Sequence, residues 1–119
     1  MSEAWGWPRV VVVDHYDGDT FFADVDQGRG THWQRASIRL AGIDAPEMRR
    51  KGQVGPDPGA VEARDFLMGL LPTGAKVELS SVGYDKYGDR VDAIVVRKSD
   101  GLNVNEAMVS AGHAVHKDY

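Results

Sequence analysis

The sequence contains no cysteine among its 119 residues. A disulfide framework and a thiolate metal site are therefore excluded, and stability has to come from packing. Long apolar runs are also absent, so we expect no membrane association. The first seven residues lack the basic segment and apolar run of a signal peptide. As given, the sequence predicts a cytoplasmic protein, or a secreted one if a signal peptide had preceded it.

Positive charge is scarce, because 14 Lys and Arg face 18 Asp and Glu, for a formal net charge of -4. Proteins that bind nucleic acid through a broad basic surface are more often basic, so the balance counts against such a surface. It does not count against a local site where a bound cation and a few arginines hold a phosphate. The length and the 42% hydrophobic content predict one globular domain, residues 1–119, and we expect a monomer.

The apolar pattern predicts five short strands and two helices. The β-branched run at 10–13 indicates a buried first strand, and further strands are expected at 20–25, 31–41, 76–82 and 90–97. Asp57 and Pro58 predict a helix start, with Asp57 as N-cap, and Asn103 is expected to cap a short helix over 104–111. The first helix is expected to bury Ala60, Ala63, Leu67, Leu70 and Leu71. This order predicts a mainly β fold with helices (α+β), a partly open five-stranded Greek-key OB-fold barrel with a helix between strands three and four.

One stretch, I-R-L-A-G-I-D-A-P-E at 38–47, combines a strand exit with charged residues. Arg39 alternates with Ile38 and Leu40, so it points away from the apolar face of the strand. Asp44 and Glu47 fall in the connection that follows. Loops held by rigid strands often carry chemistry, and an arginine with paired carboxylates is what a metal-assisted reaction on a phosphate needs.

Further motifs occur in a fixed order around this stretch. They are Asp17-Gly18-Asp19-Thr20, Asp85-Lys86-Tyr87-Gly88-Asp89-Arg90, Asn103-Val104-Asn105-Glu106 and Gly112-His113-Ala114. With these motifs the chain resembles the staphylococcal (micrococcal, thermonuclease) nuclease family from about residue 10 onward. The resemblance implies a Ca²⁺-dependent phosphodiesterase that cleaves DNA and RNA with little sequence preference, favours single strands and leaves 3′-phosphate ends.

By the same resemblance, Asp19, Asp44 and the backbone carbonyl of Ala45 are expected to hold the Ca²⁺ ion. Carboxylates without histidine or cysteine suit such a hard cation. The family more often has threonine where Ala45 stands, so a hydroxyl contact is lost here while the backbone ligand is kept. For Asp17 we favour a plain Asx-turn, which Asp-Gly pairs commonly make.

Arg39 and Arg90 are expected to grip the scissile phosphate, because their planar forks match its oxygens. The family pattern places the second arginine directly after the glycine, where this sequence has Asp89. Either a carboxylate replaces the arginine, or a one-residue insertion, such as a bulge at the strand start, restores Arg90; we favour the insertion. Glu47 is expected to act as general base or to orient the attacking water.

Lys86 and Tyr87 match family residues that contact a terminal phosphate of a bound nucleotide, and Tyr119 is matched to a base-stacking tyrosine. The alternative function is a binding module, since OB-folds also bind single-stranded nucleic acid and some domains of this family serve as interaction modules. Asp89, Ala45 and the acidic net charge favour that alternative. A third hypothesis is a fragment of a larger protein that lacks a further helix.

Overall fold

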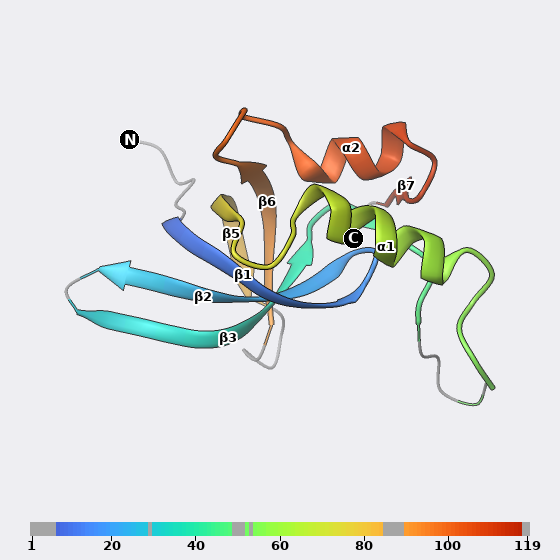
Figure 1. Ribbon diagram of the computed structural model, residues 1–119, viewed down its shortest axis with the longest axis horizontal. Helices are drawn as coiled ribbons and strands as arrows, with labels where there is room; N and C mark the ends of the chain where they lie inside the picture. The colour runs from blue at the N-terminus through green and yellow to red at the C-terminus, as the bar shows by residue number, and fades with distance from the viewer. Residues whose placement is uncertain (1–6, 29, 49–51, 53, 85–89, 118–119) are drawn as a thin grey trace.

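The computed structural model describes residues 7–28, 30–48, 52, 54–84 and 90–117. Most of these residues belong to a β-barrel with two helices at one end (Figure 1). The elements in chain order are β1 (Trp7–Asp17), β2 (Thr20–Gly28), β3 (Thr31–Leu40), β4 (Ile43–Asp44), α1 (Ala60–Leu70), β5 (Lys76–Tyr84), β6 (Val91–Arg97), α2 (Val104–Ser110) and β7 (Val115–His116). In the part of the chain described, neither helix is long and apolar enough to cross a membrane.

The barrel is closed in the strand order β1-β2-β3-β6-β5. Neighbouring strands are antiparallel except β3 and β6, which run parallel with Ile38 opposite Val91. The order and the helix between β3 and β5 confirm the predicted α+β OB-fold. The barrel differs from the prediction in being closed rather than partly open, because β1 pairs with β5.

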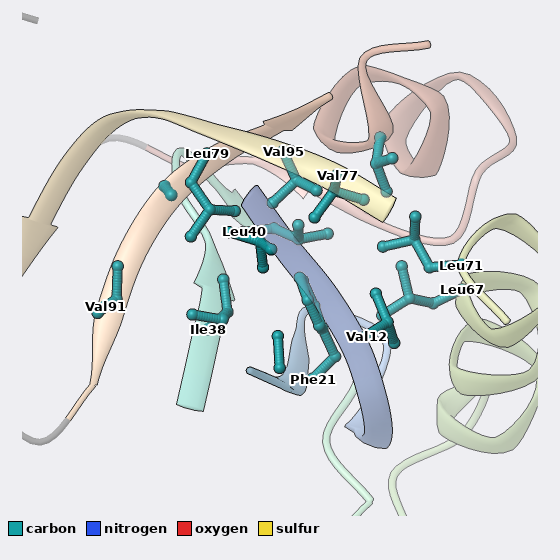
Figure 2. Close-up of a cluster of buried hydrophobic side chains, with 14 of the residues drawn as sticks. Val12, Phe21, Ile38, Leu40, Leu67, Leu71, Val77, Leu79, Val91 and Val95 are labelled. Carbon is teal, nitrogen blue, oxygen red and sulfur yellow. The ribbon is translucent and has the colours of Figure 1, made fainter. Parts of the chain in front are cut away.

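Alternation along the strands fills the barrel with apolar side chains. Val12, Phe21, Ile38 and Leu40 are all 0% exposed, and Leu67 of α1 reaches the same core (Figure 2). Burying one such side chain contributes about 1.5–3 kcal/mol. The strand exits that carry the polar residues are therefore anchored in a rigid core.

The start of α1 differs from the sequence-based prediction. The helix begins at Ala60, and its N-cap is Gly59 in the left-handed region (φ 85°), with no hydrogen bond from a capping side chain. Asp57 was predicted to cap this helix, which is wrong, because its carboxylate bonds the backbone of Glu47 instead. The predicted cap of α2 is confirmed, since the Asn103 side chain accepts from the Glu106 N–H at 3.1 Å.

Candidate active site

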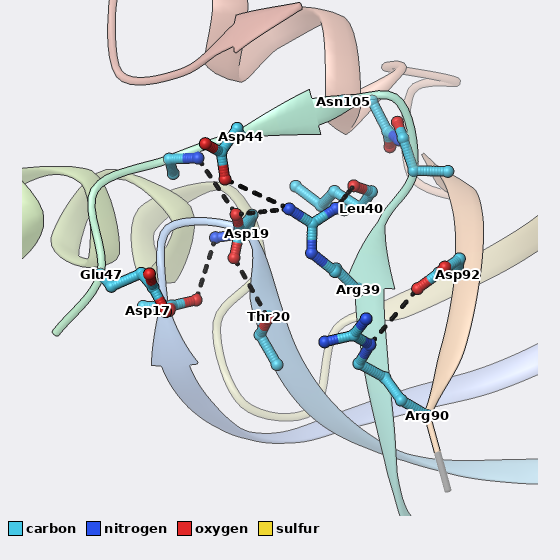
Figure 3. Close-up of polar contacts among 12 residues, drawn as sticks. Asp17, Asp19, Thr20, Arg39, Leu40, Asp44, Glu47, Arg90, Asp92 and Asn105 are labelled. Carbon is cyan, nitrogen blue, oxygen red and sulfur yellow. Dashed lines mark hydrogen bonds and ion pairs between the residues drawn. The ribbon is translucent and has the colours of Figure 1, made fainter. Parts of the chain in front are cut away.

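Two aspartates from distant parts of the chain meet at one arginine. Asp19 lies in the turn between β1 and β2, and Arg39 lies on β3. Arg39 Nη2 donates to Asp19 Oδ2 at 3.2 Å and to Asp44 Oδ1 at 3.3 Å (Figure 3). Arg39 Nη1 donates to the Leu40 carbonyl at 3.2 Å. Because the Arg39 side chain is only 12% exposed, these bonds fix the direction of its guanidinium.

Asp19 is held more firmly than Asp44. Its side chain is 5% exposed, against 42% for Asp44. Asp19 Oδ2 accepts a second hydrogen bond from the Ala45 N–H at 3.0 Å, and Oδ1 accepts one from the Thr20 hydroxyl at 3.2 Å. The Asp19 carbonyl accepts from the Leu40 N–H at 2.8 Å. Asp19 therefore ties the β1–β2 turn to both ends of the segment 40–45.

The turn that carries Asp19 packs closely against α1. A Cβ placed on Gly18 would lie 2.7 Å from the Ala63 Cβ and 3.0 Å from the Ala45 Cβ. A contact of 2.7 Å is closer than packed carbon atoms tolerate, so a side chain at this position would force a shift. Gly18 is needed here for close approach, and α1 thereby sets the position of the turn.

Asp44 is positioned by a short two-stranded sheet. β4 pairs antiparallel with β7, with Asp44 opposite Val115, and the Lys117 N–H donates to the Gly42 carbonyl at 2.8 Å. These strands have two residues each, which is too short for a periodic pattern to predict. Residues 115–117 thus hold the backbone of a candidate metal-binding residue.

Asn105 of α2 is a buried polar residue for which no role was predicted from the sequence. It is 3% exposed, and its Oδ1 accepts from the Val95 N–H at 3.0 Å. Its Nδ2 donates to the carbonyls of Ala41 at 2.9 Å and Ala93 at 3.1 Å. Asn105 therefore joins β6 to the end of β3 (Figure 3). The sequence does contain one indication of this role. A second asparagine follows Asn103 by two residues, and helix capping accounts only for Asn103.

The backbone of Glu47 makes two hydrogen bonds with Asp57, one with its side chain and one with its backbone. The Glu47 N–H donates to Asp57 Oδ2 at 3.1 Å, and the Asp57 N–H donates to the Glu47 carbonyl at 2.9 Å. These two bonds close the loop between Pro46 and Pro58 at its base. Asp57 thus fixes the backbone of the predicted general base, which explains why it does not cap α1.

Asp17 makes the predicted Asx-turn, since its Oδ1 accepts from the Asp19 N–H at 3.3 Å. Burial raises the pKa of Asp17 well above its ordinary value, and the side-chain hydrogen bond with Asp19 and the charges of Asp19 and Glu47 raise it further. The negative charges of Asp17, Asp19 and Glu47 thus lie near one another in the same pocket.

Arg90 reaches the same place from the start of β6. Its Nε lies 3.4 Å from Asp92 Oδ1, and its side chain is 41% exposed. Val91 to Ala93 pair regularly with β3, and the bulge of the β5–β6 hairpin lies between Ser80 and Gly83 of β5. The insertion was predicted at the start of the fifth strand, beside Asp89. Because Asp89 lies outside the described residues, the insertion stays a prediction.

The predicted catalytic and metal-binding side chains line one pocket of about 430 Å³. Its charged residues are Asp17, Asp19, Arg39, Asp44, Glu47 and Arg90. Ala45 is buried behind them and contributes its N–H to Asp19. Lys86, Tyr87 and Tyr119, the predicted substrate-binding residues, lie outside the described residues.

The carboxylate side chains that line the pocket are chemically suited to bind a hard cation. Its acidic groups are all carboxylates, and oxygen ligands of this kind are what Ca²⁺ prefers. Within the described residues, no group of three or more His, Asp or Glu is already arranged around a metal position. A cation at Asp19 and Asp44 would compete with Arg39 for their oxygens.

The comparison with protein families agrees with this geometry. The family model described as staphylococcal nuclease homologue matches residues 37–119. A search of curated proteins found no match to the sequence. The matched range contains Arg39, Asp44, Glu47 and Arg90 but begins after Asp19, so the contact of Asp19 with Arg39 is an independent structural observation. Because the match covers more than half of the 119 residues, the chain belongs to the staphylococcal nuclease homologue family.

Proposed function

We propose that this protein is a Ca²⁺-dependent nuclease that hydrolyses phosphodiester bonds of DNA and RNA with little sequence preference. Its family membership indicates a nuclease-type or nucleic-acid-binding domain. The observation that carries the proposal is the nearly buried Arg39, which contacts both Asp19 and Asp44 in a pocket that Glu47 and Arg90 also line. A domain that only binds nucleic acid has no chemical need for this combination.

Each charged residue has a role in the proposed reaction. Arg39 on β3 and Arg90, directly before β6, hold the scissile phosphate and stabilise the negative charge that develops on it. Water attacks phosphorus and gives a proton to the Glu47 carboxylate. The bond from phosphorus to the 5′ oxygen breaks, and that oxygen takes up a proton from solvent water. The products are a 3′-phosphate end and a 5′-hydroxyl end.

Asp19, Asp44 and the backbone carbonyl of Ala45 are the residues we assign to Ca²⁺. The ion would add positive charge next to the phosphate and make the attacking water more acidic. Asp17 belongs to the same group of carboxylates and holds the β1–β2 turn in shape. Arg39 then has two sets of partners, the aspartates in the structure described here and the phosphate in the proposed complex.

A second candidate function is binding of single-stranded nucleic acid without cleavage. The hydrogen bonds that already engage Asp19 and Asp44 with Arg39 favour it, because they occupy carboxylate oxygens that a cation would need. In that case the pocket would hold a phosphate through its arginines alone. An assay that measures both cleavage and binding of single-stranded DNA separates the two candidates.

The test is cleavage of heat-denatured DNA by the purified chain, with Ca²⁺ and with EDTA. We expect cleavage only with Ca²⁺, and Glu47→Gln should lower kcat by about 10²- to 10⁴-fold, the usual contribution of a general base. Glu78→Gln is the matched control, because Glu78 lies exposed on β5 and does not line the pocket.

Equal cleavage in EDTA, or by Glu47→Gln, would contradict the proposed mechanism and indicate a contaminating nuclease. A folded protein that binds single strands but does not cleave them would establish the binding function instead.

A further inference from the structure

The pocket has an uncharged part that the proposed reaction does not use. Tyr16, Thr20, Phe22 and Ser37 line it beside the charged residues. Tyr16 is 38% exposed, and Phe22 is half-buried. An aromatic pair that borders a phosphate-binding pocket matches a ligand with a flat apolar ring attached to a phosphate.

Phe22 on β2 lies near Arg39 on β3, on the same face of the sheet. In the β2–β3 pairing Phe22 is opposite Ser37, and Thr20 is opposite Arg39. Alternate residues share a face of the sheet, so Phe22 follows Thr20 on the outer face at a distance of about 7 Å along the strand. Phe21, between them, points into the core and is 0% exposed. The Phe22 ring is therefore within reach of the sugar and base joined to a phosphate at Arg39.

Arg35 braces the Phe22 ring from outside the pocket. Its guanidinium carbon lies 4.7 Å from the ring centroid, yet Arg35 does not line the pocket. Arg35 Nη2 donates to Asp14 Oδ2 at 2.8 Å, and the Arg35 N–H donates to Asp24 Oδ1 at 2.8 Å. Arg35 has a left-handed backbone (φ 54°), which is uncommon for a residue with a side chain. Its charge is thus countered by Asp14, and its position fixes the ring before any ligand binds.

We propose that Tyr16 and Phe22 form a nucleobase-stacking subsite for the nucleotide whose phosphate is held by Arg39 and Arg90. This inference rests on the proposed function and assigns the residues that would contact an unpaired base. A base within a duplex stacks on its own neighbours, so only an unpaired base can lie against these rings. The pocket volume of about 430 Å³ lies within the range of small-ligand sites. Stacking tolerates every base, which agrees with low sequence preference.

The test combines an abasic substrate with a variant that lacks the ring. Single-stranded oligonucleotides with one abasic position, moved stepwise along the strand, are compared with the intact oligonucleotide in Ca²⁺. At one position next to the cleaved bond, loss of the base should raise KM of the wild type by about 5- to 100-fold. Phe22→Leu should raise KM on the intact strand by a similar factor and leave kcat nearly unchanged, because the stacked base is bound alike before and during reaction.

The decisive result is the combination of the two changes. If base and ring contact each other, the abasic penalty should be smaller in Phe22→Leu than in the wild type, as in a double-mutant cycle, because only the Tyr16 ring then remains for stacking. Tyr16→Leu should reduce the same penalty. Phe66→Leu is the control, because Phe66 is a half-buried aromatic residue on α1 that packs against His113 and does not line the pocket. Thermal melting of each variant establishes that it is folded.

The possible failures are distinguishable. If the wild type cleaves single strands but no abasic position matters, or if the penalty is unchanged in both Phe22→Leu and Tyr16→Leu, the stacking subsite is wrong and the nuclease function stands. If the folded wild type neither cleaves nor binds single strands, the proposed function fails, and the subsite fails with it.

Discussion

Replacing Asn105 with alanine should cost far more stability than replacing Asn103, although the two asparagines are two residues apart. The change at Asn105 removes three buried or partly buried hydrogen bonds. The Val95 N–H is then left buried without its partner, at a cost of about 1–3 kcal/mol. The Ala41 carbonyl, which is partly buried, adds about 1 kcal/mol, while the Ala93 carbonyl still accepts from the Ala41 N–H.

The expected loss for Asn105→Ala is therefore about 2–4 kcal/mol. Asn103→Ala removes a single helix-capping bond and should cost about 1 kcal/mol. Thermal melting followed by circular dichroism, together with urea titration, measures both. At about 4 °C per kcal/mol for a domain of this size, the melting temperatures should fall by about 8–16 °C and about 4 °C respectively.

A third variant, Asn105→Asp, tests the direction of the hydrogen bonds. An aspartate keeps the acceptor for Val95 but cannot donate to the carbonyls of Ala41 and Ala93 while it is ionised. We expect it to be as unstable as Asn105→Ala at neutral pH and to recover partly in acid, where the protonated carboxyl can donate once. If Asn105→Ala melted no lower than Asn103→Ala, the account of Asn105 as the link between α2, β6 and the end of β3 would be refuted.

Two further predictions concern packing and pH. Gly18→Ala should destabilise the protein by about 1–3 kcal/mol, because its Cβ would press on Ala63. In Gly69→Ala, on α1, the new Cβ meets no atom within 4 Å, so this variant should be neutral or more stable by up to about 1 kcal/mol. Urea titration of both variants measures the difference. The Arg97 side chain lowers the pKa of Asp100 to about 2. The small stabilisation from this exposed pair should therefore be present above about pH 4 and lost as the pH falls through 2. NMR titration should show the Asp100 pKa returning toward 3.8 in Arg97→Gln, and an unchanged pKa would contradict the role of Arg97.

The barrel was predictable because its signals are periodic and local. Alternating apolar residues marked the strands, and the order of strands and helices pointed to the OB-fold. Leu67 and Leu71 showed the buried face of α1, and both are 0% exposed. Arg39 and Asp44 could be assigned to one site because they lie five positions apart at a strand exit.

Contacts that depend on the closed fold were not predictable. β4 and β7 are too short for a pattern, and their pairing joins residues far apart in the sequence. Asp57 followed by proline has the usual form of a helix start, but the chain turns once more at Gly59 and the carboxylate reaches Glu47. The sheet register, which places Phe22 beside Arg39 on one face, likewise arises only when β2 and β3 pair.

The pairing of β4 with β7 has a consequence for the order in which the pocket is assembled. A ribosome makes Asp44 long before Val115, so a growing chain presents the aspartate without the strand that fixes it. A domain folds as a unit once its last pairing segment has emerged. The backbone at Asp44 can thus be fixed only after residues 115–117 have been synthesised and have paired with β4.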